Sequence, residues 1–216
     1  CRRLVALESD DVRHGMIRAD ELIGAALCNA EDDIILVSKL GMSLKFQADD
    51  EQLRPMGRQT AGVQGMKFRN DDSLLAMDVV PGDSDKDLFV VTNEGFAKRT
   101  AISEYRLQGR NGLGIKAVQL VEGRGALVGA LVVSEDDQVM AIMKSGKVIR
   151  SNVDEVKRTG RNTQGVTFAK PDKGDTILSI ARNEEKDEPA DGGDAAANGT
   201  AETAQSGENV NNADEA

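Results

Sequence analysis

The stretch QGRNGLGIKAV, residues 108–118, gathers three glycines around a single arginine. Such a stretch fits either a loop that cradles a phosphate group or a turn that a repeated architecture needs once in every unit. Two related stretches decide between these: GRQTAGV (57–63) and GRNTQGV (160–166) share with GRNGLGI (109–115) the pattern Gly-Arg, three residues, Gly, then Val or Ile. Successive copies lie 52 and 51 residues apart. We call these segments the Gly-Arg loops.

A phosphate-binding loop joins a strand to a helix once in a domain. The Gly-Arg pattern instead recurs three times between β-rich segments, and no amphipathic helix follows it. We therefore interpret the glycines as turn formers, with Val63, Ile115 and Val166 returning the chain to the core.

Each Gly-Arg loop follows a segment that predicts a β-hairpin, namely IILVSKLGMSLKF (34–46), LFVVTNEGFAKRT (88–100) and VMAIMKSGKVIRS (139–151). In each, two apolar runs flank a short polar turn whose last residue is Gly41, Gly95 or Gly146. Glycine adopts the left-handed conformation that such turns need. A further apolar run follows each loop, beginning at residues 74, 127 and 177, and LIGAALC (22–28) is the equivalent run before the first hairpin.

Four strands in about 51 residues predict an all-β, propeller-like array of blades that bury their faces against one another. We expect repeats near 21–73, 74–125 and 126–182, preceded over 1–20 by the end of an earlier blade. Three blades do not close a ring, and the chain begins at Cys1. We therefore interpret it as a C-terminal fragment.

The net charge of −10 is concentrated at the C-terminus, where residues 184–216 hold ten acids against one lysine. This segment has almost no large apolar side chain, so we expect a disordered acidic tail. It either solubilises the chain or competes with a polyanion for the basic surface. Residues 54–183 instead carry 20 bases and 16 acids.

Cysteine and histidine are too few for a disulfide framework, a zinc site or most general-base schemes, since the chain has only Cys1, Cys28 and His14. Cys28 closes an apolar run and is expected to pack in the core. The sequence has no signal peptide and no apolar run long enough for a membrane helix. We expect a cytoplasmic protein with no membrane partner.

Basic residues recur at fixed positions in the repeats. A cation stands four residues after each turn glycine, at Lys45, Arg99 and Arg150, and each Gly-Arg loop adds one, at Arg58, Arg110 and Arg161. Around them lie Arg54, Lys67, Arg69, Lys98, Arg106, Lys116, Lys144, Lys147, Lys157 and Arg158.

In a cyclic array, one cation per repeat becomes a positive belt that suits a bent duplex held through its phosphates. Exposed strands ordinarily carry charge too, so the spacing alone leaves a DNA-binding belt and a merely solvated surface both open. Aromatic residues are few, which argues against stacking on single strands.

RPMGRQTAGVQGMKF (54–68) and LFVVTNEGFAKRTAISEYRLQGRNGLGIKAV (88–118) closely resemble blade repeats in the C-terminal domain of the DNA gyrase A protein. The resemblance covers roughly residues 20–182. It implies a β-pinwheel, in which blades exchange strands and a basic perimeter wraps double-stranded DNA. In the whole enzyme this wrapping supports ATP-dependent negative supercoiling.

The defining heptapeptide of that family, Gln-Arg-Arg-Gly-Gly-Lys-Gly, has a degenerate counterpart in Gln108, Gly109, Arg110, Asn111, Gly112, Leu113 and Gly114. The counterpart lacks one arginine and the lysine, which leaves open whether this chain wraps DNA by itself. The related C-terminal domain of topoisomerase IV lacks the heptapeptide and remains an alternative. A propeller that binds other proteins is the alternative from a different class.

The resemblance also implies that the cleavage tyrosine lies outside this chain, and we expect Tyr105 to be a packing or turn residue. The chain is then not an enzyme by itself and holds no catalytic residue, metal or cofactor; ATP and Mg²⁺ belong to the whole enzyme. Its implied partners are the remainder of the gyrase A protein and the gyrase B protein in an A₂B₂ assembly, associated with the bacterial nucleoid.

Overall fold

The structure is a computed structural model of the chain, and it describes residues 3–9, 12–13, 16–17, 21–57, 59–60, 62–82 and 84–183. Side chains are described from residue 22 onward. The predicted disorder of 184–216 and the predicted role of Arg58 therefore lie outside the described residues.

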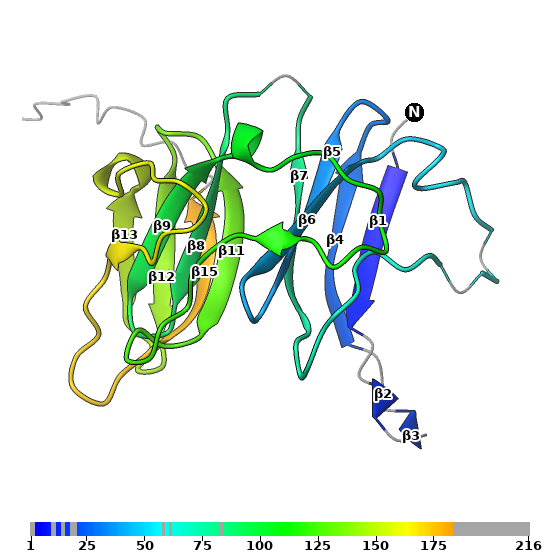
Figure 1. The fold of residues 1–216 in the computed structure, drawn as a ribbon. Helices are drawn as coiled ribbons and strands as arrows, with labels where there is room; N and C mark the ends of the chain where they lie inside the picture. The colour runs from blue at the N-terminus through cyan, green and yellow to red at the C-terminus, as the bar shows by residue number, and fades with distance from the viewer. Residues whose placement is uncertain are drawn as a thin grey trace, which may run out of the picture. The chain divides into compact units, whose positions relative to one another are not determined.

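Strands dominate the described chain, and the all-β prediction is confirmed (Figure 1). The first full sheet has the strand order β10-β6-β5-β7, and the second has the order β11-β8-β9-β14. In chain order these strands are β5 (Asp33–Ser38), β6 (Met42–Gln47), β7 (Leu74–Val80), β8 (Asp87–Thr92), β9 (Phe96–Ala101), β10 (Ile115–Lys116), β11 (Leu127–Val133) and β14 (Val166–Thr167).

A third sheet has the order β13-β12-β15. Its strands are β12 (Gln138–Met143), β13 (Val148–Asn152) and β15 (Ile177–Asn183). At the start of the chain, β1 (Arg3–Ser9) pairs with β4 (Glu21–Cys28), and β2 (Val12–Arg13) pairs with β3 (Met16–Ile17). Two 3₁₀ helices, Ile102–Glu104 and Val153–Glu155, follow β9 and β13.

The three predicted hairpins are present as β5–β6, β8–β9 and β12–β13. Their turn glycines, Gly41, Gly95 and Gly146, have φ values of 81°, 83° and 87°. These are the left-handed angles that the sequence predicted for them, where a Cβ atom is disfavoured.

Neighbouring repeats exchange strands, as the resemblance implied. Strand β10 follows the hairpin β8–β9 in sequence, yet it pairs with β6 of the preceding sheet through Ile115↔Ser43. In the same way β14 follows β12–β13 but pairs with β9 through Val166↔Ala97. Each exchanged strand covers the outer edge of the previous sheet, so that edge is not left as a template for another chain.

The sheets are out of phase with the predicted repeats by one strand. The predicted repeat 74–125 places the run 74–80 with the hairpin that follows it, but β7 pairs with the preceding β5 over Leu36↔Met77 and its neighbours. An apolar run after a loop has the same pattern whether it returns to the earlier hairpin or opens the next. Only the pairing decides: it makes each of the three sheets from a hairpin and the run after it, and an exchanged strand joins the first two.

Strands β5 and β8, which open the first two hairpins, are buried on both faces because a sheet lies on either side of each. Alternate residues of β5 point to opposite faces, so Ile34 and Leu36 join one core cluster, while Ile35 and Val37 join the next with Leu88 and Val90. On β8, Phe89 and Val91 face a third cluster, shared with β12. The continuous apolar runs of the hairpins follow from this double burial.

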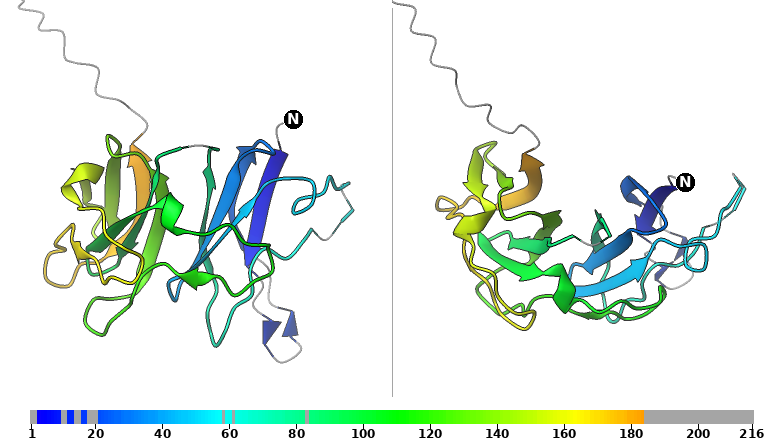
Figure 2. Two further views of the ribbon diagram at one scale, coloured as in Figure 1. Left: turned by 45° about the horizontal axis from the view of Figure 1, so that its top comes forward. Right: turned by 90° about the horizontal axis from the view of Figure 1, so that it is seen from above.

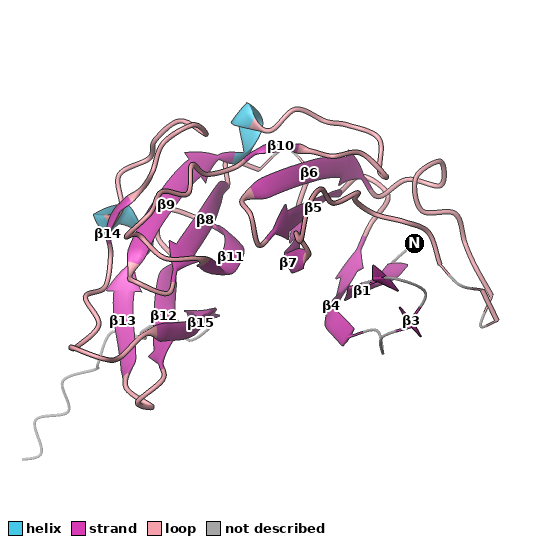
Figure 3. Ribbon diagram, turned by 60° about the horizontal axis from the view of Figure 1, so that its bottom comes forward, coloured by secondary structure: helices cyan, strands magenta, loops and turns pink. Residues whose placement is uncertain are grey.

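The sheets succeed one another in chain order (Figure 2). Strand β4 contacts β7, β7 contacts β11, and β11 contacts β15, so the last strand of each sheet lies on one side of the row (Figure 3). The exchanged strand β10 and the loops around it lie on the opposite side. Among the described residues, no helix is long and apolar enough to cross a membrane.

Candidate nucleic-acid interface

The second and third Gly-Arg loops lie where one repeat meets the one before it. Gly114 has a φ of 70°, and a Cβ atom there would approach the carbonyl oxygen of Ser43 on β6 to 2.3 Å. Gly165 repeats the arrangement on β9, with a φ of 83° and 2.6 Å to the carbonyl oxygen of Ala97. The last glycine of the loop is needed for its backbone angle and for the close approach of the exchanged strand.

Arg110 fastens its loop to the preceding repeat. Its Nε donates to the carbonyl oxygen of Gln52 at 2.6 Å, its Nη1 donates to that of Gln64 at 3.1 Å, and its backbone amide donates to Oε1 of Gln52 at 3.0 Å. Gln52 and Gln64 lie on either side of the first Gly-Arg loop. The arginine therefore joins two successive loops through carbonyl groups that need a donor.

Arg161 repeats this contact one unit later. Its backbone amide donates to Oε2 of Glu104 at 3.2 Å, and its Nη1 donates to the carbonyl oxygen of Lys116 at 3.3 Å. Gln52 and Glu104 are 52 residues apart, so they occupy one repeat position. Sequence reasoning missed both residues, although their spacing, which equals that of the Gly-Arg loops, was a usable signal.

The rest of the heptapeptide counterpart also contacts the preceding repeat. The amide of Gln108 donates to the carbonyl oxygen of Lys45 at 2.8 Å, and that of Asn111, in a left-handed conformation, donates to Gly65 at 2.6 Å. The carbonyl oxygen of Gly112 accepts the amide of Lys67. Gly109 is exposed, whereas Leu113 and Gly114 line a cleft together with Lys67 and Arg69. This segment is thus a docking element between repeats.

The cations that follow the turn glycines do not form an exposed belt. Arg99 is 4% exposed and pairs with Asp87 at 3.4 Å and with Glu135 at 3.1 Å. Lys45 pairs with Asp33 at 3.3 Å, and its side chain is 12% exposed. Arg150 on β13 is exposed. The structure thus removes Arg99, and most of Lys45, from the predicted DNA-binding surface.

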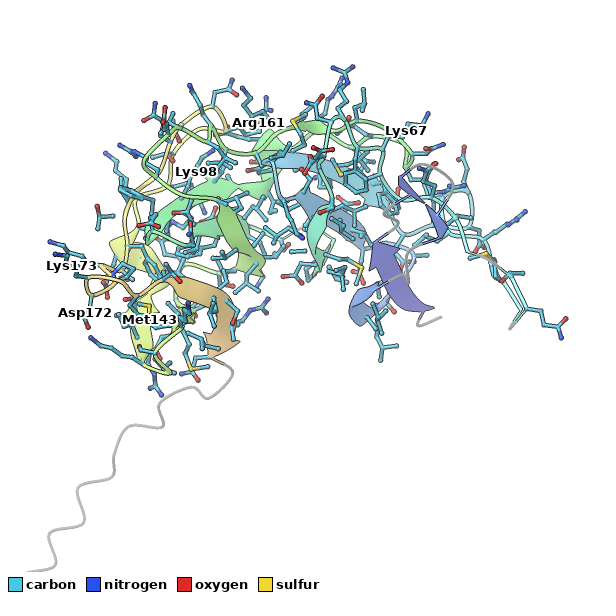
Figure 4. All side chains as sticks on the ribbon, turned by 90° about the horizontal axis from the view of Figure 1, so that it is seen from below. Lys67, Lys98, Met143, Arg161, Asp172 and Lys173 are labelled. Carbon is cyan, nitrogen blue, oxygen red and sulfur yellow. The ribbon has the colours of Figure 1, made fainter. Side chains whose placement is uncertain are left out.

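Lys98 is a further correction, because it is buried in β9 at 1% exposure. Its ammonium group donates to the carbonyl oxygens of Ala117 and Arg161, which belong to two successive repeats. Burial lowers the pKa of Lys98 to about 8, while Glu104 acts to raise it and Arg161 to lower it. Figure 4 shows Lys98 within the sheets and Lys67 at their edge.

Arg158 and Asp87 connect the second hairpin to the loop of the next repeat. Nε of Arg158 lies 2.9 Å from Oδ1 of Asp87, and its Nη2 lies 3.3 Å from Oδ1 of Asp85. Burial raises the pKa of Asp87, and the guanidinium groups of Arg158 and Arg99 oppose that rise. Arg158 is exposed enough to meet a ligand, but part of its charge is already neutralised.

Seven predicted cations remain exposed and, within the part of the chain that the structure describes, have no ion pair or side-chain hydrogen bond. They are Arg54, Lys67, Arg69, Arg106, Lys116, Lys144 and Lys157. Lys147 is also exposed but pairs with Asp172 at 3.4 Å. Three of the seven, Arg54, Arg106 and Lys157, stand three residues before a Gly-Arg loop in each repeat. We call these three residues the cation row.

Tyr105 and the potential metal ligands complete the account of the described residues. Tyr105 is 2% exposed and lies in a core cluster, which confirms the prediction that it is a packing residue. Its burial raises its pKa. No group of three or more His, Cys, Asp or Glu side chains within the described ranges is arranged to hold a metal ion.

Comparison with known proteins also divides this chain into three repeats. A family model described as the DNA gyrase C-terminal domain, beta-propeller, matches residues 32–81, 86–134 and 137–184. The bounds of these matches follow the sheets rather than the repeats predicted from sequence.

Curated relatives extend the match to named proteins. The DNA gyrase A protein of Streptomyces coelicolor is 53% identical over 187 residues, which are 86% of this chain and 22% of the relative. The same protein of Mycolicibacterium smegmatis is 52% identical over 172 residues, or 80% of this chain and 20% of the relative. The chain thus spans about a fifth of the length of these relatives.

Two solved structures resemble the fold. The C-terminal domain of DNA gyrase A matches with a TM-score of 0.68 at 26% identity, covering 76% of this chain and 54% of that one. The C-terminal domain of DNA topoisomerase IV matches with a TM-score of 0.70 at 18% identity, covering 78% and 51%. The second likeness concerns the fold alone.

Proposed function

The chain belongs to the DNA gyrase C-terminal domain family, and from this membership we propose that it binds and wraps duplex DNA as a module of a gyrase A protein. In the proposed setting the remainder of that protein and the gyrase B protein supply DNA cleavage, ATP and Mg²⁺ in an A₂B₂ enzyme, and the wrap supports negative supercoiling. This chain contributes binding and bending, and no chemistry. The relatives near 50% identity are gyrase proteins, which favours gyrase over topoisomerase IV.

The observation that carries the proposal is the cation row. Arg54, Arg106 and Lys157 are exposed, carry no competing carboxylate among the described residues, and occupy one position in three successive repeats. Each stands next to a Gly-Arg loop, and the contacts of Arg110 and Arg161 fasten successive loops to one another. The row therefore repeats once in each unit, which suits contacts to phosphates at intervals along a bent duplex.

Duplex DNA is the favoured form of nucleic acid. Proteins that bind single strands without sequence preference stack bases on exposed aromatic side chains. All five phenylalanines and the one tyrosine of this chain are described, and none of them is exposed. Binding that rests on phosphate contacts alone fits a duplex, whose bases are already stacked.

The test compares two triple variants of the chain in binding to a duplex of about 40 base pairs at several salt concentrations. One replaces Arg54, Arg106 and Lys157 by Ala. The matched control replaces Lys39, Lys170 and Lys173, which are also exposed, so both variants lose the same charge.

We expect the row variant to lose affinity and to lower the slope of log K against log salt by roughly 0.9 for each phosphate contact removed. The control should retain most of the affinity and slope. An equal loss in both variants would show that only net charge matters, and no loss in either would contradict the proposal.

A further inference from the structure

Three sheets meet at the backbone of one residue, Val132 on β11. The amide of Val132 donates to Oδ2 of Asp78 on β7 at 2.7 Å, and its carbonyl oxygen accepts a hydrogen bond from Nη2 of Arg182 on β15 at 2.6 Å. Nη2 of Arg182 also lies 3.5 Å from Oδ2 of Asp78, which closes the triangle. Asp78 and Arg182 are 104 positions apart and belong to the first and third sheets.

This contact supplies hydrogen-bond partners to one residue on a strand edge that no other described strand pairs with. Among the described strands, β11 is the last of its sheet and pairs only with β8, so its other edge presents backbone groups that no described strand pairs with. An unsatisfied edge costs free energy when it is buried and invites pairing with another chain when it is open. Here Asp78 and Arg182, each from a neighbouring sheet, bind the amide and the carbonyl oxygen of Val132.

The contact lies on the side of the row opposite to the exchanged strand β10 (Figure 3). The apolar clusters hold adjacent sheets face to face. Such packing is non-directional and tolerates a change of angle better than hydrogen bonds do. The Asp78–Val132–Arg182 contact is directional and spans three sheets, so it can fix the angle between them, and with it the curvature along which the cation row is displayed.

We propose that Asp78 and Arg182 are positioning residues for DNA wrapping, which act by fixing the angle between three successive blades and touch no DNA themselves. The inference rests on the proposed function. It predicts that breaking the contact changes how far bound DNA is bent, while the affinity for a short, straight duplex is unchanged.

The variants are Asp78→Ala and Arg182→Gln, which break the contact from either side, in the 216-residue chain. The matched control is Asp172→Asn, since Asp172 pairs with Lys147 at the surface, with side chains 78% and 56% exposed. Asp78→Ala and the control each remove one negative charge. Circular dichroism and urea unfolding establish that each variant is folded.

Three readouts separate geometry from binding. Spin labels on Lys39→Cys and Lys144→Cys, in a chain that also carries Cys1→Ser and Cys28→Ala, report the distance between the first and third hairpin turns without DNA. Fluorescence anisotropy gives the affinity for a duplex of about 20 base pairs, which is far shorter than the persistence length and behaves as a rod. Ligation of nicked circles at saturating protein reports the trapped writhe.

We expect both variants to shift or broaden the label distance and to trap less writhe, with unchanged affinity for the short duplex, while the control matches the wild type. Unchanged label distances in folded variants overturn the inference, as does an equal loss of writhe in Asp172→Asn. A wild-type chain that does not bind DNA overturns the proposed function instead, and the label distances then still decide the geometric part.

Discussion

Arg110 and Gln52 are joined twice across the boundary between two repeats: the arginine Nε donates to the glutamine carbonyl oxygen, and the arginine amide donates to the glutamine side chain. Arg110, which the sequence pattern predicts to contact DNA, thus binds another part of the chain instead. This changes what its replacement should do.

Replacing Arg110 by Ala should destabilise the fold by about 1–3 kcal/mol, because the part-buried carbonyl group of Gln52 and the exposed one of Gln64 lose a charged donor. Arg106→Ala, only four residues earlier, should leave stability nearly unchanged and weaken DNA binding. Urea denaturation and salt-dependent DNA binding, measured on both variants, separate the two roles. Equal stability of the two variants would remove the structural role of Arg110.

Gly114→Ala should destabilise the chain more than Gly62→Ala. Both glycines have positive φ, at 70° and 77°, but only at Gly114 does a Cβ atom meet backbone, at 2.3 Å from Ser43. Gly62 has open space around it, so Gly62→Ala should lose only the roughly 1 kcal/mol of backbone strain. Thermal or urea unfolding of the two variants measures the difference, and equal losses would mean that the exchanged strand moves away at no cost.

Arg99→Ala should cost about 3 kcal/mol or more, because it leaves the buried carboxylate of Asp87 with Arg158 as its remaining partner. Arg150 occupies the same repeat position but is exposed. Arg150→Ala should therefore change the free energy of unfolding by less than about 0.5 kcal/mol. Comparable losses in the two variants would contradict the assignment of Arg99 to the interior.

Lys98 should make stability depend on pH in the alkaline range. Its folded pKa, about 8, lies below the ordinary value of 10.5, so between these values the unfolded chain binds more protons than the folded one. The contribution of Lys98 to stability therefore increases as pH rises through that window. Urea unfolding at a series of pH values should give a less positive slope for Lys98→Leu, which introduces the residue found at the equivalent Leu44.

The control for this prediction is Lys67→Leu, since Lys67 is an exposed lysine outside the core. Its pH dependence should match that of the wild type. If Lys98→Leu also matches the wild type, the ammonium group of Lys98 titrates as it does in the unfolded chain.

The sequence alone determined the repeat, its period, the hairpins and the left-handed glycines, because these depend on local backbone geometry and on alternation along one strand. Gly41, Gly95 and Gly146 show this, since a tight turn of that kind selects glycine wherever it occurs. The family resemblance added the exchange of strands, which no local pattern contains.

Only the tertiary structure decided which cations face solvent. Arg99 and Arg150 have the same place in their repeats, yet one is buried and the other exposed, because a further sheet and its loop cover the second hairpin, while no described segment covers the third. The contacts of Asp78 and Arg182 with Val132 likewise form only because three sheets meet there. Burial and long-range pairing depend on what neighbouring blades bring to a position, which the position's own sequence does not encode.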